Sequence, residues 1–271
     1  KLALIGCGKM GSAILRGWLA AGERSKVLVL DPAGLPPELT PLVDGKVAYF
    51  KSTSEFVKAA TAEKPDVFLL AVKPQVMEAA CRSIAPAVSR EALILSIAAG
   101  QAIASFEKRF ALTQSIVRAM PNTPAAIGKG ITIAVAGRHV SAAQKQIAAG
   151  ILQTTGVLEW IDDEGLLDAV TALSGSGPAY VFLLIDTLAS AGMKAGLPTD
   201  LAGKLARQTV IGAAALAESE PDTDAAQLRK NVTSPGGTTE AALKVLMNGE
   251  LQEIFDAALT AATARGRELN K

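Results

Sequence analysis

The chain is poor in the side chains that usually carry acid–base, metal and disulfide chemistry. Its 271 residues include one histidine and two cysteines. Cys7 and Cys81 are too few for a disulfide framework and lack metal-ligand spacing, which favours a reducing compartment and a cytoplasmic location. His139 lies in the segment GRHVS, before a predicted helix and away from the strand ends, so we expect a solvent-facing loop residue rather than a catalytic base. No metal site is predicted.

Aromatic residues are also few, and neither positive nor negative charge is in clear excess. Aromatics make up 4% of the chain, so its core must be built mainly from the Ala, Leu, Val and Ile among the 49% hydrophobic residues. Lys and Arg (27) nearly balance Asp and Glu (26) without clustering, which argues against a nucleic-acid partner. No apolar stretch reaches the roughly 18 to 20 uninterrupted residues of a membrane span, and the first residues resemble a strand rather than a signal peptide. We therefore expect a small-molecule partner and no membrane.

Short apolar runs alternate with amphipathic stretches as far as about residue 160. Strands separated by helices indicate βαβ units and a doubly wound parallel α/β sheet. Beyond Gly165 the pattern becomes helical throughout. We predict a dinucleotide-binding domain over 1–162 and a helical domain over 163–271, divided at the acidic segment 162–164. The expected strands fall within 2–6, 26–31, 47–50, 66–72, 92–98, 115–120 and 131–137, and the expected helices lie around 178–195, 200–218, 237–248 and 250–268.

The segment Gly6-Cys7-Gly8-Lys9-Met10-Gly11 joins the first predicted strand to a helical pattern. GxGxxG alone occurs often by chance, but strand, motif and helix in this order are what dinucleotide binding requires. Gly6 permits a tight turn, Gly8 lets the backbone approach a pyrophosphate, and Gly11 lets the helix pack on the strand. The helix N-terminus then favours the phosphates.

Asp31 follows the second strand, about 20 residues beyond the glycine motif, where a carboxylate can accept a hydrogen bond from the adenosine ribose 2′-OH. An acid there repels a 2′-phosphate, and no Lys or Arg follows closely, so the sequence leans towards NADH over NADPH. The alternative is that Asp31 caps the Pro-rich turn after it.

Three further segments end strands at the carboxyl edge of the sheet, where doubly wound folds bind ligands. Lys73, in 71–75, is a candidate for contact with phosphate, ribose or a substrate carboxylate, or is a solvated loop lysine. The small residues of 96–100 allow a flat nicotinamide to lie close to the backbone. Asn122, held between two prolines in 120–124, could read a polar ligand group. Each segment alone could be plain turn chemistry.

The helical half contains two polar, glycine-containing segments, 173–180 and 231–240. The first leads into a helix with Pro178 near its first turn, so exposed N–H groups gather there. The second has two glycines at a helix start, a nest of donors suited to a carboxylate, and Thr238 and Thr239 add hydroxyls. The alternative for either segment is an N-cap followed by a turn.

Together these motifs resemble the pyrroline-5-carboxylate reductase family over essentially the whole chain. The resemblance implies an N-terminal Rossmann domain and an all-α dimerisation domain whose helices interlace with a partner's. It also implies an active site at a homodimer interface, possible assembly into a decamer, and NAD(P)H-dependent reduction of L-1-pyrroline-5-carboxylate to L-proline. The matching segments are, in order, GCGKMG, AVKPQ, SIAAG, RAMPNTP, LSGSGPAYVF and NVTSPGGTTEAAL.

Site residues follow from the resemblance motif by motif. The cofactor set is Gly6, Cys7, Gly8, Lys9, Met10, Gly11, Ala71, Val72, Lys73, Pro74, Ala98 and Ala99, to which the residues themselves add Asp31 and Asn122. The substrate set is Glu164, Asn231, Ser234, Gly237, Thr238 and Thr239, with Thr239 also beside the ring nitrogen as the catalytic candidate and Asn231 near the nicotinamide. The chain departs from the family in two places. DPAGLPP replaces a loop suited to a 2′-phosphate, and Ser52-Thr53-Ser54 replaces a frequent Asn, so the adenosine contact is transferred to Thr53.

Two other functions are considered. A 3-hydroxyacid dehydrogenase of the same architecture needs a catalytic Lys and Asn soon after a Gly-rich turn, but no Lys follows GSGPAYVF before Lys194. A non-catalytic dinucleotide-sensing or scaffold protein would keep the glycine motif but would not need the donor-rich segment NVTSPGGTT.

Overall fold

A computed structural model describes residues 1–22, 25–42 and 45–269, which form two units by their contacts. The first unit comprises 1–176 and the end of the last helix from Ala262, and the second comprises Gly177–Ala261. The segment after residue 162 stays with the first unit because Leu167 is buried in the core beneath the sheet. The division by contacts thus falls later than the predicted division at 162/163.

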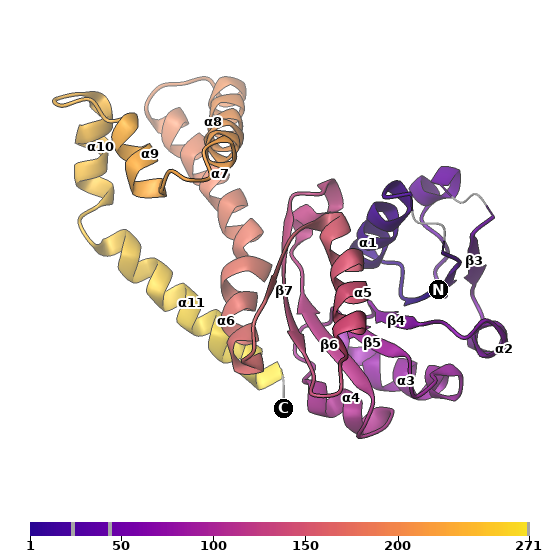
Figure 1. Ribbon diagram of the computed structural model, residues 1–271. Helices are drawn as coiled ribbons and strands as arrows, with labels where there is room; N and C mark the ends of the chain where they lie inside the picture. Colours follow the sequence, from indigo (N-terminus) through magenta and orange to yellow (C-terminus); the bar gives the residue numbers. More distant parts are fainter. Residues whose placement is uncertain (23–24, 43–44, 270–271) are drawn as a thin grey trace. The chain divides into compact units, whose positions relative to one another are not determined.

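The first unit is built on an eight-stranded sheet in the order β3-β2-β1-β4-β5-β6-β7-β8, coloured from indigo to rose in Figure 1. The strands β1 to β6 are parallel, which confirms the doubly wound α/β prediction. Their order reverses between β1 and β4, and ligands bind at such a switch point. The strands are β1 (Leu2–Ile5), β2 (Val27–Leu30), β3 (Val47–Phe50), β4 (Val67–Leu70), β5 (Leu93–Ser96), β6 (Ser115–Met120), β7 (Gly130–Ala136) and β8 (Gly156–Trp160).

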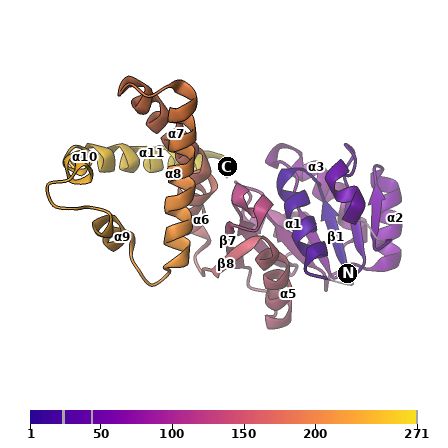
Figure 2. The same cartoon turned by 90° about the horizontal axis from the view of Figure 1, so that it is seen from above.

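The last two strands differ from the all-parallel prediction. β7 runs antiparallel to β6, and β8, which the sequence analysis did not count as a strand, pairs parallel with β7. Figure 2 shows β7 and β8 side by side with α5 (Ala142–Leu152) beside them. The connection from β6 to β7 is one short turn of 3-10 helix, Thr123–Ile127, too short for the crossover that parallel strands need.

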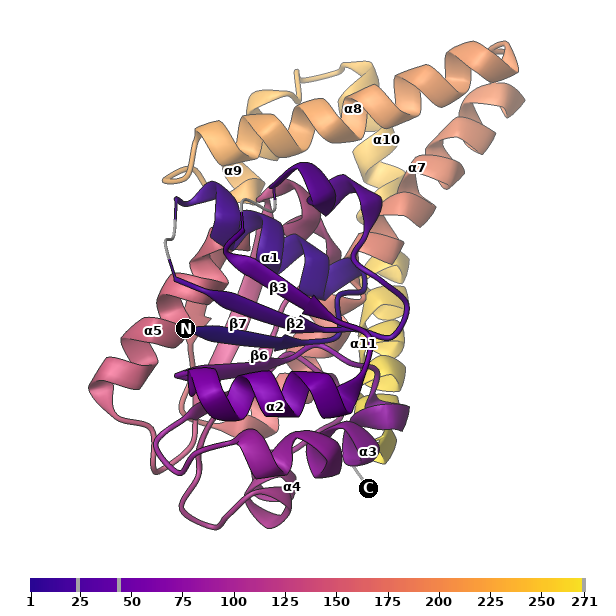
Figure 3. The ribbon, with the colours of Figure 1, turned by 90° about the vertical axis from the view of Figure 1, so that its right-hand side faces the viewer.

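Helices cover both faces of the sheet, so the core has two halves. Alternate residues of β1 point to opposite faces: Leu2 and Leu4 join one apolar cluster, whereas Ala3 and Ile5 join the other. α1 (Lys9–Ala20) and α5 pack on the first cluster. The second cluster is covered by α2 (Thr53–Glu63), α3 (Pro74–Ile84) and α4 (Ile103–Arg109), which lie below the sheet in Figure 3.

Short helical turns complete the first unit. They lie between two strands or between a strand and a helix and, in one case, widen a longer helix. The 3-10 turns are η1 (Pro37–Leu42), η2 (Ala85–Ala87), η3 (Thr123–Ile127), η4 (Gln153–Thr155) and η5 (Glu164–Leu166), and η6 (Thr171–Gly175) is a π-helical turn.

The predicted polar turn at 173–180 is instead part of a nearly continuous helical run. α6 (Leu167–Val170), the π-helical η6 and α7 (Gly177–Lys194) follow one another directly. In η6 the N–H of Ser176 donates to the oxygen of Thr171 at 2.9 Å, a five-residue step. The widened turn places Gly175 where an added Cβ would lie 2.6 Å from the Met120 side chain. The N–H groups expected to gather at this helix start are therefore used within the helix.

By length and composition alone, the run Glu164–Lys194 could cross a membrane. The sequence analysis missed this run because Gly, Ser and Thr interrupt the apolar residues without making the segment strongly polar. A helix that packs against another protein surface has the same composition, so this observation is weak evidence for a membrane partner.

The second unit is entirely helical, as predicted, with one helix more than expected. It contains α7, α8 (Thr199–Ser219), α9 (Ala225–Asn231), α10 (Thr238–Leu246) and most of α11 (Glu250–Leu269). The additional helix, α9, begins where the Asp224 side chain accepts from the N–H of Gln227 at 2.7 Å.

Almost none of the second unit is buried within the chain. Between residues 177 and 261, which the structure describes throughout, only Ala202 and Ala206 are buried. Phe182 and Leu183 on α7 are 63% and 64% exposed. Exposed apolar surface on this scale marks a protein–protein or membrane contact.

Candidate functional site

The glycine-rich loop has the geometry that each glycine was predicted to need. Gly6 adopts a φ of +93°, and an added Cβ there would lie 2.8 Å from the oxygen of Ala71. A Cβ on Gly11 would overlap the oxygen of Gly6, so this position must be glycine for α1 to pack on β1. Around Gly8 there is open space, with no atom within 4 Å of an added Cβ. The residues present therefore fit a pyrophosphate above Gly8 at the start of α1.

A groove of about 560 Å³ opens at the switch point beside this loop. The loop, the ends of β2 and β4 and the start of α3 contribute to it. Of the predicted cofactor residues, those that line the groove are Gly6, Gly8, Asp31, Thr53, Ala71, Val72 and Lys73. Cys7, Lys9, Met10, Gly11 and Pro74 belong to the same loop and helix starts without lining the groove.

One face of α3, missed by the sequence analysis, also lines the groove. Val76, Ala79, Ala80 and Ser83 are spaced i, i+3, i+4 and i+7, and all four belong to the lining. This spacing was visible in the sequence. Small residues at these positions leave room beside the phosphate loop.

The Asp31 carboxylate is held in place by two backbone groups. The N–H of Cys7 donates to Oδ2 at 2.6 Å, and the N–H of Ala33 donates to Oδ1 at 2.8 Å. The Tyr49 hydroxyl donates to the Asp31 backbone oxygen. Burial, with the nearby Asp31 charge adding to it, raises the pKa of Tyr49 above its ordinary value. Asp31 therefore both caps its turn and lines the groove, so the two predicted roles are compatible.

Ala98 and Ala99 lie just beyond β5, at the same carboxyl edge of the sheet. Ala98 is buried, and its N–H lies 3.4 Å from the Ser96 hydroxyl oxygen. The described groove does not include either alanine. Their predicted place beside the nicotinamide stays a prediction.

Asn122 bridges three parts of the first unit. Its Oδ1 accepts from the N–H of Ile131 at 3.0 Å, and its Nδ2 donates to the Ser174 hydroxyl at 3.2 Å. The side chain thus ties the end of β6 to the start of β7 and to the π-helical turn. This amide is engaged in structure, which the predicted ligand contact did not anticipate.

Glu164 is likewise engaged within the first unit. Its Oε1 accepts from Arg118 Nη1 at 2.8 Å and from the N–H of Ile103 at 2.9 Å. Arg118 is a buried residue of β6, and Ile103 begins α4. Glu164 therefore compensates a buried positive charge and a helix N-terminus, and its predicted proximity to substrate stays a prediction.

The predicted substrate residues of the second unit surround the loop between α9 and α10. Gly236 adopts a φ of +71°, and its N–H donates to Glu240 Oε2 at 2.6 Å. The N–H of Gly237 donates to the oxygen of Ser234 at 3.0 Å. The two glycine N–H groups predicted to form a nest are thus already used. The Thr233 hydroxyl is also used, because it donates to the Arg229 oxygen at 2.6 Å. The Ser234 hydroxyl and the first N–H groups of α10, which have no partner within the helix, are the donors left in this loop.

Asn231, the last residue of α9, precedes this loop. Its Oδ1 accepts from Gln227 Nε2 at 2.8 Å, so a ligand contact by this side chain would use its NH₂ group as a donor. Thr238 and Thr239 occupy the first two positions of α10 after the N-cap Gly237.

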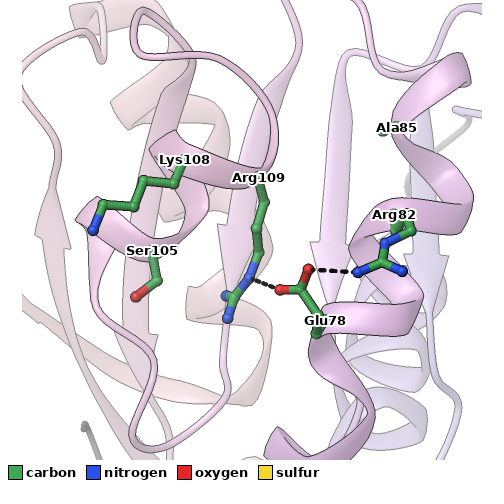
Figure 4. A pocket seen from close by; sticks show the side chains of 6 residues that line it. All are labelled: Glu78, Arg82, Ala85, Ser105, Lys108 and Arg109. Carbon is green, nitrogen blue, oxygen red and sulfur yellow. Dashed lines mark hydrogen bonds and ion pairs between the residues drawn. The ribbon is translucent and has the colours of Figure 1, made fainter.

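A second hollow in the first unit, of about 440 Å³, is lined by charged residues of α3 and α4. Figure 4 shows Glu78 between Arg109 and Arg82. Arg109, and then Arg82, hold the pKa of Glu78 below its usual range. Glu78 pairs with both arginines, and Lys108 adds a third cation to the lining, so this hollow between two helices carries more positive than negative charge. His139 is exposed, as predicted, beside Arg138.

Comparisons with known protein families cover most of the chain. Residues 164–269 match the pyrroline-5-carboxylate reductase dimerisation family, and residues 1–100 match the coenzyme F420-dependent NADP oxidoreductase family. The first match begins close to the predicted domain start at 163.

Curated relatives match from end to end. The pyrroline-5-carboxylate reductase of Pseudomonas aeruginosa is 42% identical, and the match covers 99% of this chain and 96% of the relative. The enzyme of Synechocystis is 39% identical, with 100% and 98% covered.

Solved structures agree with the sequences. A pyrroline-5-carboxylate reductase from Coxiella burnetii shares 37% identity with a TM-score of 0.88, covering 100% of this chain and 98% of that one. The Plasmodium falciparum enzyme, solved with NADP bound, shares 30% identity with a TM-score of 0.81 and the same coverage. Prephenate dehydrogenase from Aquifex aeolicus, at 17% identity and a TM-score of 0.52, shows a common fold alone. Identity over the full length, together with the glycine loop and the helical second unit, places this chain in the pyrroline-5-carboxylate reductase family.

Proposed function

We propose that the protein is an NAD(P)H-dependent pyrroline-5-carboxylate reductase. It transfers a hydride to the C=N bond of L-1-pyrroline-5-carboxylate and yields L-proline, the last step of proline biosynthesis. The observation that carries this proposal is 42% identity to an enzyme of that name over 99% of the chain. The glycine loop supports it independently, because its open space at Gly8 suits a pyrophosphate.

When bound, NADH or NADPH supplies the hydride. The chain holds the dinucleotide through the N–H groups of the Gly6–Gly11 loop, with Asp31 and Thr53 on the adenosine side and Lys73 at the start of α3. Ala98 and Ala99 offer small side chains that let a flat ring approach the edge of the sheet. Asn122 contributes by fixing the end of β6 rather than through a free amide.

The substrate carboxylate binds at the start of α10. Ser234, Thr238 and Thr239 supply hydroxyls there, and Gly237 brings the backbone close. We assign Thr239 to the ring nitrogen of the substrate and Asn231 to the neighbourhood of the nicotinamide. Glu164 acts at a distance, by orienting Arg118 and the start of α4.

The reaction places little demand on acid–base groups. A protonated imine already accepts hydride, and the product amine keeps the proton. This suits a chain whose only histidine is exposed and away from the groove. Proximity and orientation then supply most of the rate enhancement.

The exposed helices of the second unit bind a second copy of the chain. The match to a dimerisation family and the two buried residues among 177–261 support a homodimer. A decamer built from five dimers is the larger assembly that we propose. We propose neither a membrane nor a nucleic-acid partner, because the same contacts account for the apolar run 164–194 and the basic and acidic residues balance in number. We place the enzyme in the cytoplasm.

A turnover assay tests the function. Purified protein is mixed with L-1-pyrroline-5-carboxylate and either NADH or NADPH, and loss of the reduced-nicotinamide absorbance is followed together with formation of proline. Absence of turnover with both cofactors would remove the proposal. Turnover of a 3-hydroxyacid in its place would reassign the chain to a dehydrogenase.

A further inference from the structure

Among the described residues that line the groove, one carries a carboxylate, Asp31. Asp31 directly follows β2 and lines the groove with Gly6, Gly8 and Thr53. β2 neighbours β1 in the sheet, so the adenosine half of a dinucleotide bound above Gly8 extends towards Asp31. An acid in this position accepts a hydrogen bond from the ribose 2′-OH.

Two backbone hydrogen bonds hold this carboxylate in one orientation. Each of its oxygens accepts one backbone N–H, from Cys7 at 2.6 Å and from Ala33 at 2.8 Å. A carboxylate has about four lone-pair sites, so it can still accept from a 2′-OH. It cannot turn away from a 2′-phosphate without breaking the bond that braces the glycine loop itself.

The charges around the groove do not offset Asp31. Among the groove-lining residues that the structure describes, Lys73 is the only cation, and it lies beyond β4, across β1 from β2. The segment 32–42 contains no Lys or Arg. Lys51 follows β3, whose last residue accepts from the N–H of Asp31, but Lys51 is exposed and does not line the groove.

We infer that Asp31, braced by the amides of Cys7 and Ala33, makes this protein NADH-preferring by accepting from the ribose 2′-OH and repelling the 2′-phosphate of NADPH. The inference rests on the proposed function and makes it more specific. It departs from the expectation set by the NADP oxidoreductase match and by the NADP-bound relative. The cofactor named in those comparisons is that of the family or of the relative, whereas the two backbone hydrogen bonds to Asp31 are observed in this chain.

The test measures binding separately from turnover. Kd values for NADH and NADPH are determined by isothermal titration calorimetry for the wild type and for Asp31→Ser and Asp31→Asn. The wild type is expected to bind NADH at least about tenfold more tightly than NADPH, since like charges at close range repel strongly in a partly buried groove. Both variants are expected to bind NADPH more tightly by about tenfold and NADH a few-fold more weakly.

Two control variants test whether the loss of an acidic charge elsewhere, or of the nearby cation Lys51, also changes cofactor binding. Asp162→Asn, which removes an exposed charge beyond β8, should leave both Kd values unchanged, and Lys51→Gln should leave the preference unchanged. Circular dichroism melts show which variants fold. If the Asp31 variants do not fold, the ratio of the NADPH Kd to the NADH Kd of the wild type still tests the inference. Equal or tighter NADPH binding by the wild type, with full turnover, overturns the inference while the proposed function stands. Failure to bind or turn over with either cofactor overturns both.

Discussion

At the scale of single residues, Thr239 gives the most direct test of substrate binding. It occupies the second position of α10, where the backbone N–H has no acceptor within the helix. We expect Thr239→Ala to raise KM for L-1-pyrroline-5-carboxylate and to lower kcat, because a hydrogen bond to a charged carboxylate contributes about 1.5 to 3 kcal/mol. Steady-state kinetics measure both constants, and calorimetry should find the cofactor Kd nearly unchanged.

The matched control for this prediction is Thr199→Ala, a threonine in the first turn of α8 that the site does not use. Its kinetic constants should equal those of the wild type. If Thr239→Ala behaved like this control, the 231–240 loop would be a structural turn without a role in binding.

Cys81 provides a residue-scale prediction about pH. The thiol is buried on α3, and burial raises its pKa to about 11. The unfolded chain loses this proton near the ordinary pKa of about 8.5, so the folded state binds the proton more tightly. Stability from this group is therefore full below about pH 8.5 and is lost as pH rises towards 11, by up to about 3 kcal/mol.

Denaturant unfolding of the wild type and of Cys81→Ala between pH 7 and pH 11 measures this loss. The difference in stability between the two proteins should shrink as the pH rises. Because both proteins contain the same other titratable groups, the effects of those groups cancel in this difference. A difference that stays constant across this range would mean that the thiol ionises as readily in the folded protein as in the unfolded chain.

The backbone geometry of single residues could be predicted from sequence where its cause was local, whereas contacts between distant residues could not. Gly6, Gly8 and Gly11 act through the turn that contains them, so their spacing was sufficient. For Asn122 and Glu164 the sequence predicted ligand contacts but did not show their partners within the protein: Ser174 lies 52 residues from Asn122, and Arg118 lies 46 residues from Glu164. Only the fold brings these pairs together.

At the scale of elements, the glycine loop and α1 act as one unit, and alanine substitutions at two of its glycines should have different effects. Gly8→Ala adds a methyl group where no atom lies within 4 Å, so the protein should keep its thermal stability. The methyl group occupies the space proposed for the pyrophosphate, however, so we expect cofactor affinity to fall by about tenfold or more.

Gly11→Ala should, in contrast, act mainly on the thermal stability of the protein. Its Cβ would overlap the oxygen of Gly6, so α1 must move from β1 and the melting temperature should fall by several degrees. Thermal melts and calorimetry on both variants separate the two cases. Equal loss of stability in Gly8→Ala would show that the open space around Gly8 is structural and not a binding site.

Element prediction succeeded where periodicity was clear and failed where the context of the element decided. All seven expected strands formed, because each is a short apolar run bounded by turn residues. β8 was missed because its residues alternate in exposure at the sheet edge, and the direction of β7 depends on the short connection before it. The 173–180 segment contains Ser, Gly and Pro, which usually mark turns. Here these residues lie in a π-helical turn and in the start of α7, so the helix continues through them.

At the scale of the whole molecule, the exposure of the second unit implies that folding and assembly are linked. A helical unit whose buried residues are two alanines cannot offset its conformational entropy through burial within the chain. Sequence composition indicated small residues for close helix packing, but the number of chains that share the packing is not encoded in any one motif. An obligate dimer then has no stable folded monomer.

Disrupting the apolar surface of α7 tests this link. Leu183 is 64% exposed in the single chain, and Leu183→Glu would place a charge in the interface twice, once from each copy, if the dimer has twofold symmetry. Each lost leucine contact costs about 1.5 to 3 kcal/mol, and burying an unpaired carboxylate adds to this. Light scattering should then show a smaller particle, with a lower melting temperature and little turnover. The control Leu112→Glu makes the same change at a leucine 65% exposed between α4 and β6 and should leave mass and activity intact. A Leu183→Glu protein with unchanged mass and full activity would mean that this face of α7 lies outside the interface.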